Sequence, residues 1–333
     1  MLRNIVFLII GISFAVSNAY SQDIHYSQFF NSPLNLNPAL TGIFNGNVRL
    51  HANYKDQWAG VPVGYSSADL GFDMKQQVGK KGHFLGFGAL LNYDRAGDLD
   101  LGWTGGNLFL SLSLKLGDHS FITPGLTVGF YQRGLNPSNA TTGNQSSGKG
   151  VDPTIAAEAI NNENVNFGDI GLGLNYRWQK NFRKHLDLGA SLSHVNGPET
   201  QFLTTTNTQV VRPQRLSAYG IFQTPLGDKL DLILNGLYSM QDVYEEIVLN
   251  IQGKVYLNSS KSTALYLGVG TRLEDALYPM IGLEVGPLYG AFSYDLNNSN
   301  FDVATNGRGG PELSLRYIWS KVPDVDYKPC LIY

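Results

Sequence analysis

The chain has almost no cysteine: among its 333 residues only Cys330 is one. An internal disulfide framework is therefore excluded. The N-terminal part of the chain also has no cysteine that could carry a lipid anchor. Charged residues are also scarce, at 15% against about 25% in a typical protein. The 24 Lys and Arg nearly balance the 27 Asp and Glu, so the composition gives no reason to expect a nucleic-acid partner.

Long apolar runs are missing as well. The run over residues 5–16 is about a dozen residues long, whereas a membrane-spanning helix needs about 20. It follows Arg3 and precedes the small-x-small triplet Ala19-Tyr20-Ser21, which is the pattern of a cleaved secretory signal peptide. We expect residues 1–21 to be that signal and Gln22 to begin the mature chain; the competing interpretation is a retained anchor.

Glycine and aromatic residues are abundant instead. The chain has 38 Gly, 17 Phe and 18 Tyr, and it lacks long helical patterns. This composition in an exported chain is typical of an all-β protein. Two classes remain: a periplasmic or extracellular β-sandwich, and an outer-membrane β-barrel.

The alternation of residue types favours the barrel. Over residues 108–116 every even position is Leu, while the odd positions are Phe109, Ser111, Ser113 and Lys115. Residues 48–55, 170–177, 186–193 and 313–320 alternate in the same way. The second face is mostly Gly, Ser and Asn, whereas a sandwich usually exposes many Lys, Glu and Thr there. Small polar residues suit the crowded, wet interior of a barrel whose outer face meets lipid.

About fourteen segments alternate in this way. Connections after even-numbered segments are short, whereas several after odd-numbered segments are long: 134–167, 196–213 and 297–310. The sequence predicts a transmembrane antiparallel β-barrel of about 14 strands over residues 47–321, with short periplasmic turns, long external loops and a periplasmic tail at 322–333. The expected strands are 47–57, 65–76, 83–94, 103–116, 121–133, 168–179, 185–195, 214–225, 229–240, 246–258, 262–273, 278–286, 287–296 and 311–320.

Charged residues on the inward face carry both signs. An ion-selective pore would usually favour one sign, so we expect either a ladder of internal ion pairs or a lumen occupied by polypeptide, with ligand binding as a further alternative. The predicted lumen charges are Arg49, Lys55, Asp69, Asp73, Lys115, Arg133, Arg177, Asp187, Asp231, Lys254, Arg272, Glu284 and Arg316.

Catalytic motifs are missing: the chain contains no GxSxG, HExxH or CxxC. His51 faces inward and could meet an inward Ser and Asp, but a lone lumen histidine is more often a hydrogen-bonded filler. We therefore predict no catalytic, cofactor-binding or metal-binding residues.

Two motifs near the start resemble the PorP/SprF family of type IX secretion system outer-membrane proteins. The first runs from Ser27-Gln28-Phe29-Phe30 through Pro33–Ala39 to Gly42, and the second is Asn53–Trp58 followed by Pro62 and Gly64-Tyr65. A weaker likeness lies at Lys328-Pro329-Cys330. One departure is Ala59, where the family more often has Pro.

The resemblance implies a barrel that helps to secrete a cargo protein and to hold it at the cell surface. It also implies two kinds of partner: a secreted cargo with a type IX C-terminal domain, and components of the type IX machinery on the periplasmic side. A passive porin and a lipid-modifying barrel enzyme remain the alternatives.

Residues 22–46 precede the first strand, so we expect them to start on the periplasmic side. Asn37 and Pro38 can cap and open a short helical turn, and the apolar residues need burial. The segment therefore either fills the periplasmic mouth as a partial plug or docks on a periplasmic partner. The candidate contact residues, including those of the first external connection and the tail, are Phe29, Phe30, Pro33, Asn35, Asn37, Pro38, Trp58, Pro62, Tyr65, Pro329 and Cys330.

Overall fold

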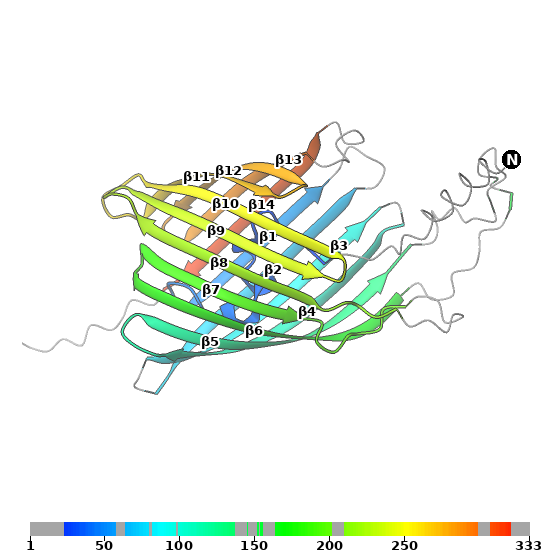
Figure 1. Cartoon of the computed structure of the whole chain (residues 1–333), viewed down its shortest axis with the longest axis horizontal. Coiled ribbons are helices and arrows are strands. Elements are labelled where there is room, and N and C mark those ends of the chain that lie inside the picture. Colours follow the sequence, from blue (N-terminus) through cyan, green and yellow to red (C-terminus); the bar gives the residue numbers. More distant parts are fainter. Residues whose placement is uncertain are drawn as a thin grey trace, which may run out of the picture.

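The structure is a computed structural model, and it shows one closed antiparallel barrel (Figure 1). It describes residues 23–57, 64–79, 82–97, 99–136, 145, 152, 154–155, 164–201, 210–298 and 307–320. Within these residues, no helix is both long enough and apolar enough to cross a membrane.

Fourteen strands form the wall, and each pairs with its neighbours in sequence while the last closes on the first. The predicted fold is therefore confirmed, with strand ends that differ by at most four residues, at the start of β6. The strands are β1 Val48–Gln57, β2 Tyr65–Val78, β3 His83–Ala96, β4 Leu101–Lys115, β5 Ser120–Gly134, β6 Asn164–Asn181, β7 Lys184–Ser193, β8 Arg215–Pro225, β9 Leu230–Gln241, β10 Tyr244–Tyr256, β11 Thr263–Arg272, β12 Ala276–Val285, β13 Leu288–Asn297 and β14 Arg308–Trp319.

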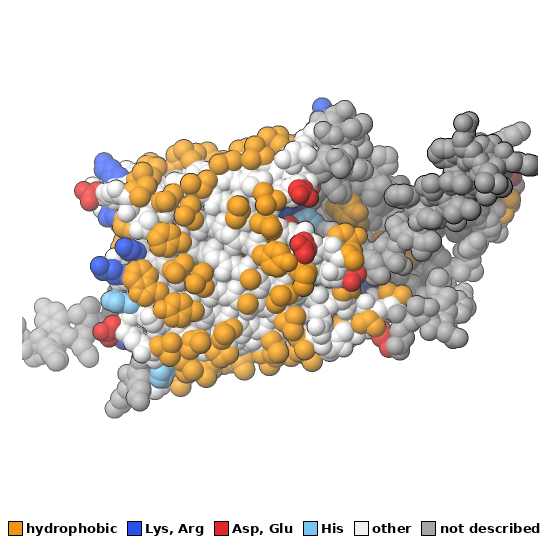
Figure 2. Space-filling view, in the orientation of Figure 1, with side chains coloured by type: hydrophobic (Ala, Val, Ile, Leu, Met, Phe, Trp, Pro, Cys, Tyr) orange, Lys and Arg blue, Asp and Glu red, His pale blue; other side chains and the backbone are white. Residues whose placement is uncertain are grey.

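The alternation of the sequence becomes the two faces of this wall. On β4, Leu108 is 70% exposed on the outside, whereas Phe109 is 5% exposed inside. Successive side chains of a strand point to opposite faces, so β4 meets the surroundings with leucine and the lumen with Phe109, Ser111 and Ser113. Figure 2 shows the resulting cover of apolar side chains over the wall, with charged side chains gathered near its two ends.

The two ends of the barrel differ. At one end, which we call the turn end, all connections are short; Gly79 and Gly286 take positive φ angles of 66° and 58° there, which glycine adopts without strain. The other end, the loop end, carries the long connections such as 194–214. Three loop-end connections are short as well, 97–100 between β3 and β4, 242–243 between β9 and β10, and 273–275 between β11 and β12, so the rim is low over these strands.

The core of the molecule lies in the lumen rather than in the wall. Residues 23–46 contain three short helices inside the barrel: η1 Phe29–Asn31, α2 Pro33–Leu36 and η2 Pro38–Leu40. Asn37 caps η2 by accepting a hydrogen bond from the Ala39 N–H, and Pro38 stands at the first helical position. Apolar residues of this stretch pack against inward residues of β8, β9, β10 and β12: Phe29, Leu36, Leu40 and Ile43 against Tyr219, Leu237, Val248 and Tyr278.

Candidate functional site in the barrel lumen

The candidate site is the lumen together with residues 23–46, which we call the lumen segment. At its start, Asp23 contacts Gln241 and Arg212 at the loop end. At its other end, Asn45 accepts a hydrogen bond of 2.9 Å from Gln179 near the turn end. The segment, blue in Figure 1, therefore runs through the barrel along its length.

This path corrects one prediction. The segment is expected to start on the turn side and either to fill that mouth as a partial plug or to dock on a periplasmic partner, but its first described residues lie at the loop end. The physical reason is that charged and polar side chains that bind the segment line the lumen from one end to the other. At the loop end these include His194 and Arg212, which lie outside the strands and so were not identified by the alternation. The signal peptide 1–21, Gln22, Trp58, Pro62, Pro329, Cys330 and the tail 322–333 lie outside the described residues, whereas Tyr65 begins β2 and is exposed.

The loop-end anchor is built around the Asp23 carboxylate. Arg212 donates to Asp23 Oδ1 from Nε at 3.1 Å and from Nη2 at 2.5 Å, and His194 Nε2 lies 2.6 Å from Oδ2. The other His194 nitrogen lies 2.8 Å from Asp169. Arg212 also stacks over the Trp103 ring, 4.5 Å from its centroid. Charge-assisted bonds of this kind are stronger than neutral ones.

The charges of the anchor support one another. Burial raises the pKa of Asp23, but the Arg212 and His194 cations outweigh it and hold that pKa well below its usual 3.8. Burial lowers the pKa of His194, but the carboxylates of Asp23 and Asp169 outweigh it and raise the pKa above its usual 6.5. Both groups therefore favour their charged forms.

Further along, carboxylates of the wall accept hydrogen bonds from the backbone of the lumen segment. The N–H groups of Ser27 and Gln28 donate to Glu312 at 2.8 and 2.7 Å. The Ser27 hydroxyl donates to Asp295 at 2.7 Å, and Lys55 lies 3.4 Å from the same carboxylate. The wall thus supplies acceptors to a stretch of chain whose own N–H groups are outside regular structure.

The middle of the segment is held in the same way. Ser32 donates to Asp69 at 2.7 Å and Asn35 donates to it at 3.1 Å. Asn37 donates to the carbonyls of Leu174 and Ala190 at 3.1 and 3.0 Å. Asn35 and Asn37, both predicted contact residues, therefore contact the wall of their own barrel.

Near the turn end, Asp73 joins the segment to the wall. Its carboxylate accepts from the Gly42 N–H at 2.7 Å and from Arg49 at 2.8 Å through two nitrogens. Arg49 also donates to the Leu40 carbonyl at 3.2 Å. One ion pair of the predicted ladder therefore also binds the segment.

Glycines on the wall make room for this contact. A Cβ on Gly125 would lie 2.3 Å from the Ala39 nitrogen, and a Cβ on Gly173 would lie 1.9 Å from Asn37 Oδ1. Real Cβ atoms essentially never approach other atoms so closely, so only glycine allows the segment to lie against β5 and β6.

Most of the other predicted lumen charges also have partners among the described residues. Arg177 lies 3.8 Å from Asp187, Arg272 lies 3.1 Å from Asp295, and Glu284 lies 3.0 Å from Lys254 and 3.7 Å from Arg316. Asp231 pairs with Arg183. Arg133 donates to the Thr200 carbonyl at the loop end, and Lys115 lies near the turn end of β4. The lumen thus combines both arrangements that mixed signs suggested, ion pairs and bound polypeptide.

Sequence reasoning missed several residues that hold the segment. Asp295 and Glu312 are inward residues of β13 and β14, so the alternation could have identified them. Asp23, His194 and Arg212 belong to no strand, and no periodic signal marks them. His51 is buried and lies over Gly71, where a Cβ would come within 2.0 Å of its ring.

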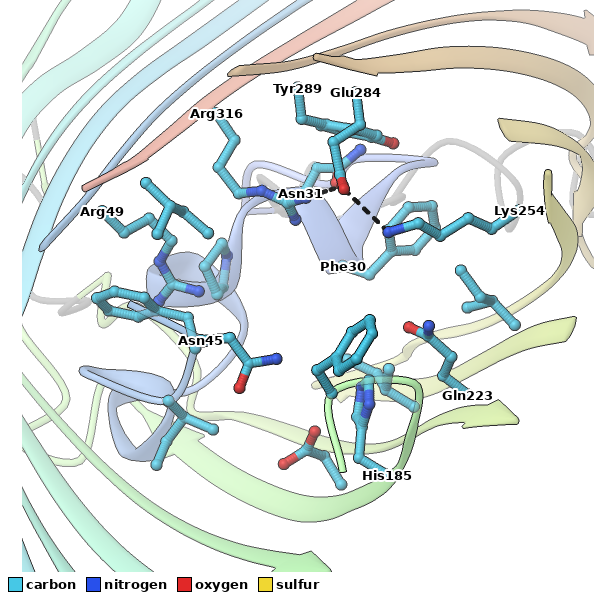
Figure 3. A pocket seen from close by; sticks show the side chains of 18 of the residues that line it. Phe30, Asn31, Asn45, Arg49, His185, Gln223, Lys254, Glu284, Tyr289 and Arg316 are labelled. Carbon is cyan, nitrogen blue, oxygen red and sulfur yellow. Dashed lines mark hydrogen bonds and ion pairs between the residues drawn. The ribbon is translucent and has the colours of Figure 1, made fainter. Parts of the chain in front are cut away.

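Among the cavities along the lumen segment, one lies toward each of its ends. The turn-end cavity, which we call the vestibule, has a volume of about 690 Å³. It is lined by Phe30, Pro33 and Leu40 of the segment and by wall residues such as Glu284 and Arg316 (Figure 3). The loop-end cavity has about 240 Å³ and reaches Asp23 and His25.

The barrel is similar to solved structures of membrane barrels. The toluene transporter TbuX of Ralstonia pickettii superposes with a TM-score of 0.50 at 12% identity, over 86% of this chain and 92% of that one. A FadL homologue of Pseudomonas aeruginosa gives a TM-score of 0.50 at 13% identity, over 84% and 92%. At such identities the likeness shows the fold alone. No curated protein matches the sequence.

Fold and lumen together define a β-barrel membrane protein of the outer-membrane type. The family described as type IX secretion system membrane protein PorP/SprF matches residues 18–317. The chain belongs to this family, as the two motifs near its start predicted.

Proposed function

We propose that this chain is a non-enzymatic outer-membrane barrel of the type IX secretion system that supports secretion and cell-surface anchoring of a cargo protein such as an adhesin. In this proposal the turn end faces the periplasm and meets machinery components, and the loop end faces outward. The cargo carries a type IX C-terminal domain. The exported chain loses its signal peptide before the barrel inserts into outer-membrane lipid.

The proposal is carried by the membership of the chain in this family. It is supported by the lumen, which is filled by the chain's own residues 23–46. A general porin needs a water-filled lumen. Here residues 23–46 lie between the two cavities and are held by hydrogen bonds and ion pairs along the wall. Such a barrel is better suited to hold partners at its two ends than to pass solutes.

The test is an affinity pull-down from native outer membranes in gentle detergent. A tag is inserted within residues 137–144, in the long connection between β5 and β6, and an unrelated outer-membrane barrel with the same tag is the control. Recovery of one dominant large secreted protein with a type IX C-terminal domain, in the sample and not in the control, is the expected result. A barrel that is recovered alone and conducts ions in planar bilayers would contradict the proposal.

The second candidate is a channel for small solutes. It draws support from the fold shared with a toluene transporter and from the cavity at each end of the lumen. Solute uptake by proteoliposomes that contain the purified barrel separates the two functions, because an anchoring barrel gives no uptake above that of empty liposomes.

A further inference from the structure

The vestibule carries an inference beyond the secretion role. It opens at the turn end, and its lining comes from the lumen segment and from strands around the barrel, β1 and β6 to β14. In Figure 3, Phe30 projects into it from the segment, while Arg316, Glu284 and Lys254 approach one another from the wall. Its volume of about 690 Å³ lies in the range of pockets that hold a small molecule, so it has room for a few side chains.

Positive charge is in excess here. The lining contains Arg49, Arg177, Lys254 and Arg316 but only two carboxylates, Asp187 and Glu284. Arg49 is neutralised from outside the lining by Asp73. The remaining three cations therefore share two carboxylates.

Glu284 is the shared carboxylate. Lys254 lies 3.0 Å from one of its oxygens, and the other oxygen lies 3.7 Å from Arg316 and accepts a 2.6 Å hydrogen bond from Tyr266. Arg316 stacks over the Tyr289 ring, 4.4 Å from its centroid. The long contact to Glu284 leaves the Arg316 guanidinium able to form a bidentate pair with a further carboxylate.

Arg177 is a second weakly paired cation of the vestibule. Its side chain is 9% exposed, and its Nε lies 3.8 Å from Asp187, too far for a hydrogen bond. No acceptor for this N–H is found among the described residues. A buried donor without an acceptor is costly, and the long contact to Asp187 leaves the Arg177 charge only partly compensated. A carboxylate brought to this wall would therefore be favoured by that charge.

The lining also contains amide side chains, such as Gln223 and Asn235, and an apolar part. Phe30 of the segment and Ile221 and Ile233 of the wall face the same space, beside the buried cluster that contains Phe29. A ligand for this cavity therefore combines negative charge with aromatic or aliphatic groups.

We propose that the vestibule is a docking site for an acidic polypeptide segment of a periplasmic partner, in which carboxylate side chains alternate with aromatic or aliphatic ones. The carboxylates pair with Arg316, Lys254 and Arg177, and the apolar side chains pack on Phe30 and the two isoleucines. The inference rests on the proposed function for the side of the membrane and for the existence of a machinery partner. The chemistry of the ligand follows from the lining alone.

The test measures binding of a fluorescent model peptide, Asp-Leu-Asp-Phe-Asp-Leu, to the purified full chain in detergent by fluorescence anisotropy. The comparison peptide has Asn in place of each Asp. The acidic peptide should bind more tightly by about tenfold, which is ~1.4 kcal/mol, and added salt should weaken it.

Two substitutions in the vestibule are expected to change the affinity for the acidic peptide in opposite directions. R316Q should weaken binding of the acidic peptide by about tenfold, because it removes a charge-assisted pair. E284Q should strengthen binding several-fold, because it frees Lys254 and Arg316. K229Q is the matched control, since Lys229 is exposed at the turn end outside the vestibule, and it should leave binding unchanged. A gain in affinity by E284Q cannot come from misfolding.

Three results would overturn the docking proposal. The acidic and Asn peptides could bind equally, millimolar acetate could displace the peptide completely and so reveal a small-anion site, or the peptide could bind only after deletion of residues 321–333. The last result would make the chain's own tail the occupant. The peptide-binding assay needs no cargo, so it is independent of the pull-down. If the barrel binds the acidic peptide normally but recovers no cargo in the pull-down, the secretion role is contradicted and the docking site is still supported.

Discussion

Single side chains determine how firmly the lumen segment is attached, and Asp23 shows this most directly. Its carboxylate meets Arg212, His194 and Gln241, which belong to different parts of the loop end. Removing one partner of a buried ion pair costs more than the pair itself contributes, because it leaves the other charge without compensation.

We therefore expect D23N to lower the free energy of unfolding by about 3 kcal/mol. Urea unfolding in lipid vesicles measures it. D242N is the matched control, because Asp242 is an exposed carboxylate at the loop end and Asn tolerates its positive φ of 55°. Equal losses in the two variants would show that Asp23 is not an anchor.

The pH dependence of the anchor follows from its two shifted groups. The raised pKa of His194 adds stability that is fully present below the usual value of 6.5 and is lost as pH rises through the raised value. The lowered pKa of Asp23 adds stability that is present above 3.8 and is lost as pH falls through the lowered value. The anchor is therefore strongest in mildly acid solution.

H194Q isolates the histidine part of this dependence. The difference in unfolding free energy between wild type and H194Q should be largest near pH 5.5 and should shrink as pH rises past the raised pKa of His194. Urea unfolding at several pH values measures it. A difference that grows with pH would contradict the assignment of a protonated His194 between Asp23 and Asp169.

Elements fit together in this barrel through matched surfaces, and β5 provides the clearest case. Its outer face is apolar, while Gly125 on its inner face lies against η2. The strand therefore needs apolar side chains toward the lipid and a residue without a side chain where η2 packs against it.

G125A should displace η2 and destabilise the protein by about 1–3 kcal/mol, the usual cost of overpacking. G236A is the control, because a Cβ there meets only Leu249 Cδ2 at 3.6 Å. Protease accessibility of the lumen segment, measured together with urea unfolding, separates displacement of η2 from general loss of stability. An undisturbed segment in G125A would contradict the close packing.

The outer face of β4 gives a prediction about depth in the membrane. L110R places a charge near the middle of the strand and should cost about 2–4 kcal/mol, whereas L116R at the turn end should cost about 0–1 kcal/mol. Both leucines are exposed, at 45% and 63%. Unfolding in lipid vesicles tests the difference, and equal costs would place the membrane elsewhere along the strand.

At the scale of the whole molecule, the filled lumen predicts electrical behaviour. The wild-type barrel should show little conductance in planar bilayers, because residues 23–46 occupy the passage, and a chain without residues 23–46 should conduct. Since that deletion could prevent folding, D23N provides the second measurement: release of the loop end should raise the frequency of brief openings. Large steady conductance in the wild type would contradict the role of the segment as a plug.

Most of the fold was accessible from the sequence because lipid imposes a strict rule on strands. Leu108, Leu110 and Leu112 all face outward, and a shift by one residue would reverse the faces. All fourteen strands followed from this rule, and the lengths of the connections between them gave the sorting of turns and loops. The short connections at 242–243 and 273–275 also agree with the expected strand ends, which leave only 241–245 and 274–277 between the strands.

Less of the site could be predicted. The sequence identified the inward charges, and the family resemblance selected the contact residues of the segment, including Asn35 and Asn37. It did not indicate which wall residue each would meet: Asp69 lies 34 positions from Asn35, and Ala190 lies 153 positions from Asn37. Such contacts depend on where the closed wall places distant residues.

The sequence by itself determined that this chain forms a barrel of about 14 strands with a polar lumen, since alternation is a local property that neighbouring residues carry. Only the tertiary structure decided the path of the lumen segment, its start between Arg212 and His194, and the excess of positive charge in the vestibule. The physical reason is that hydrogen bonds and ion pairs depend on distances across the lumen, which exist only after the first and last strands have joined.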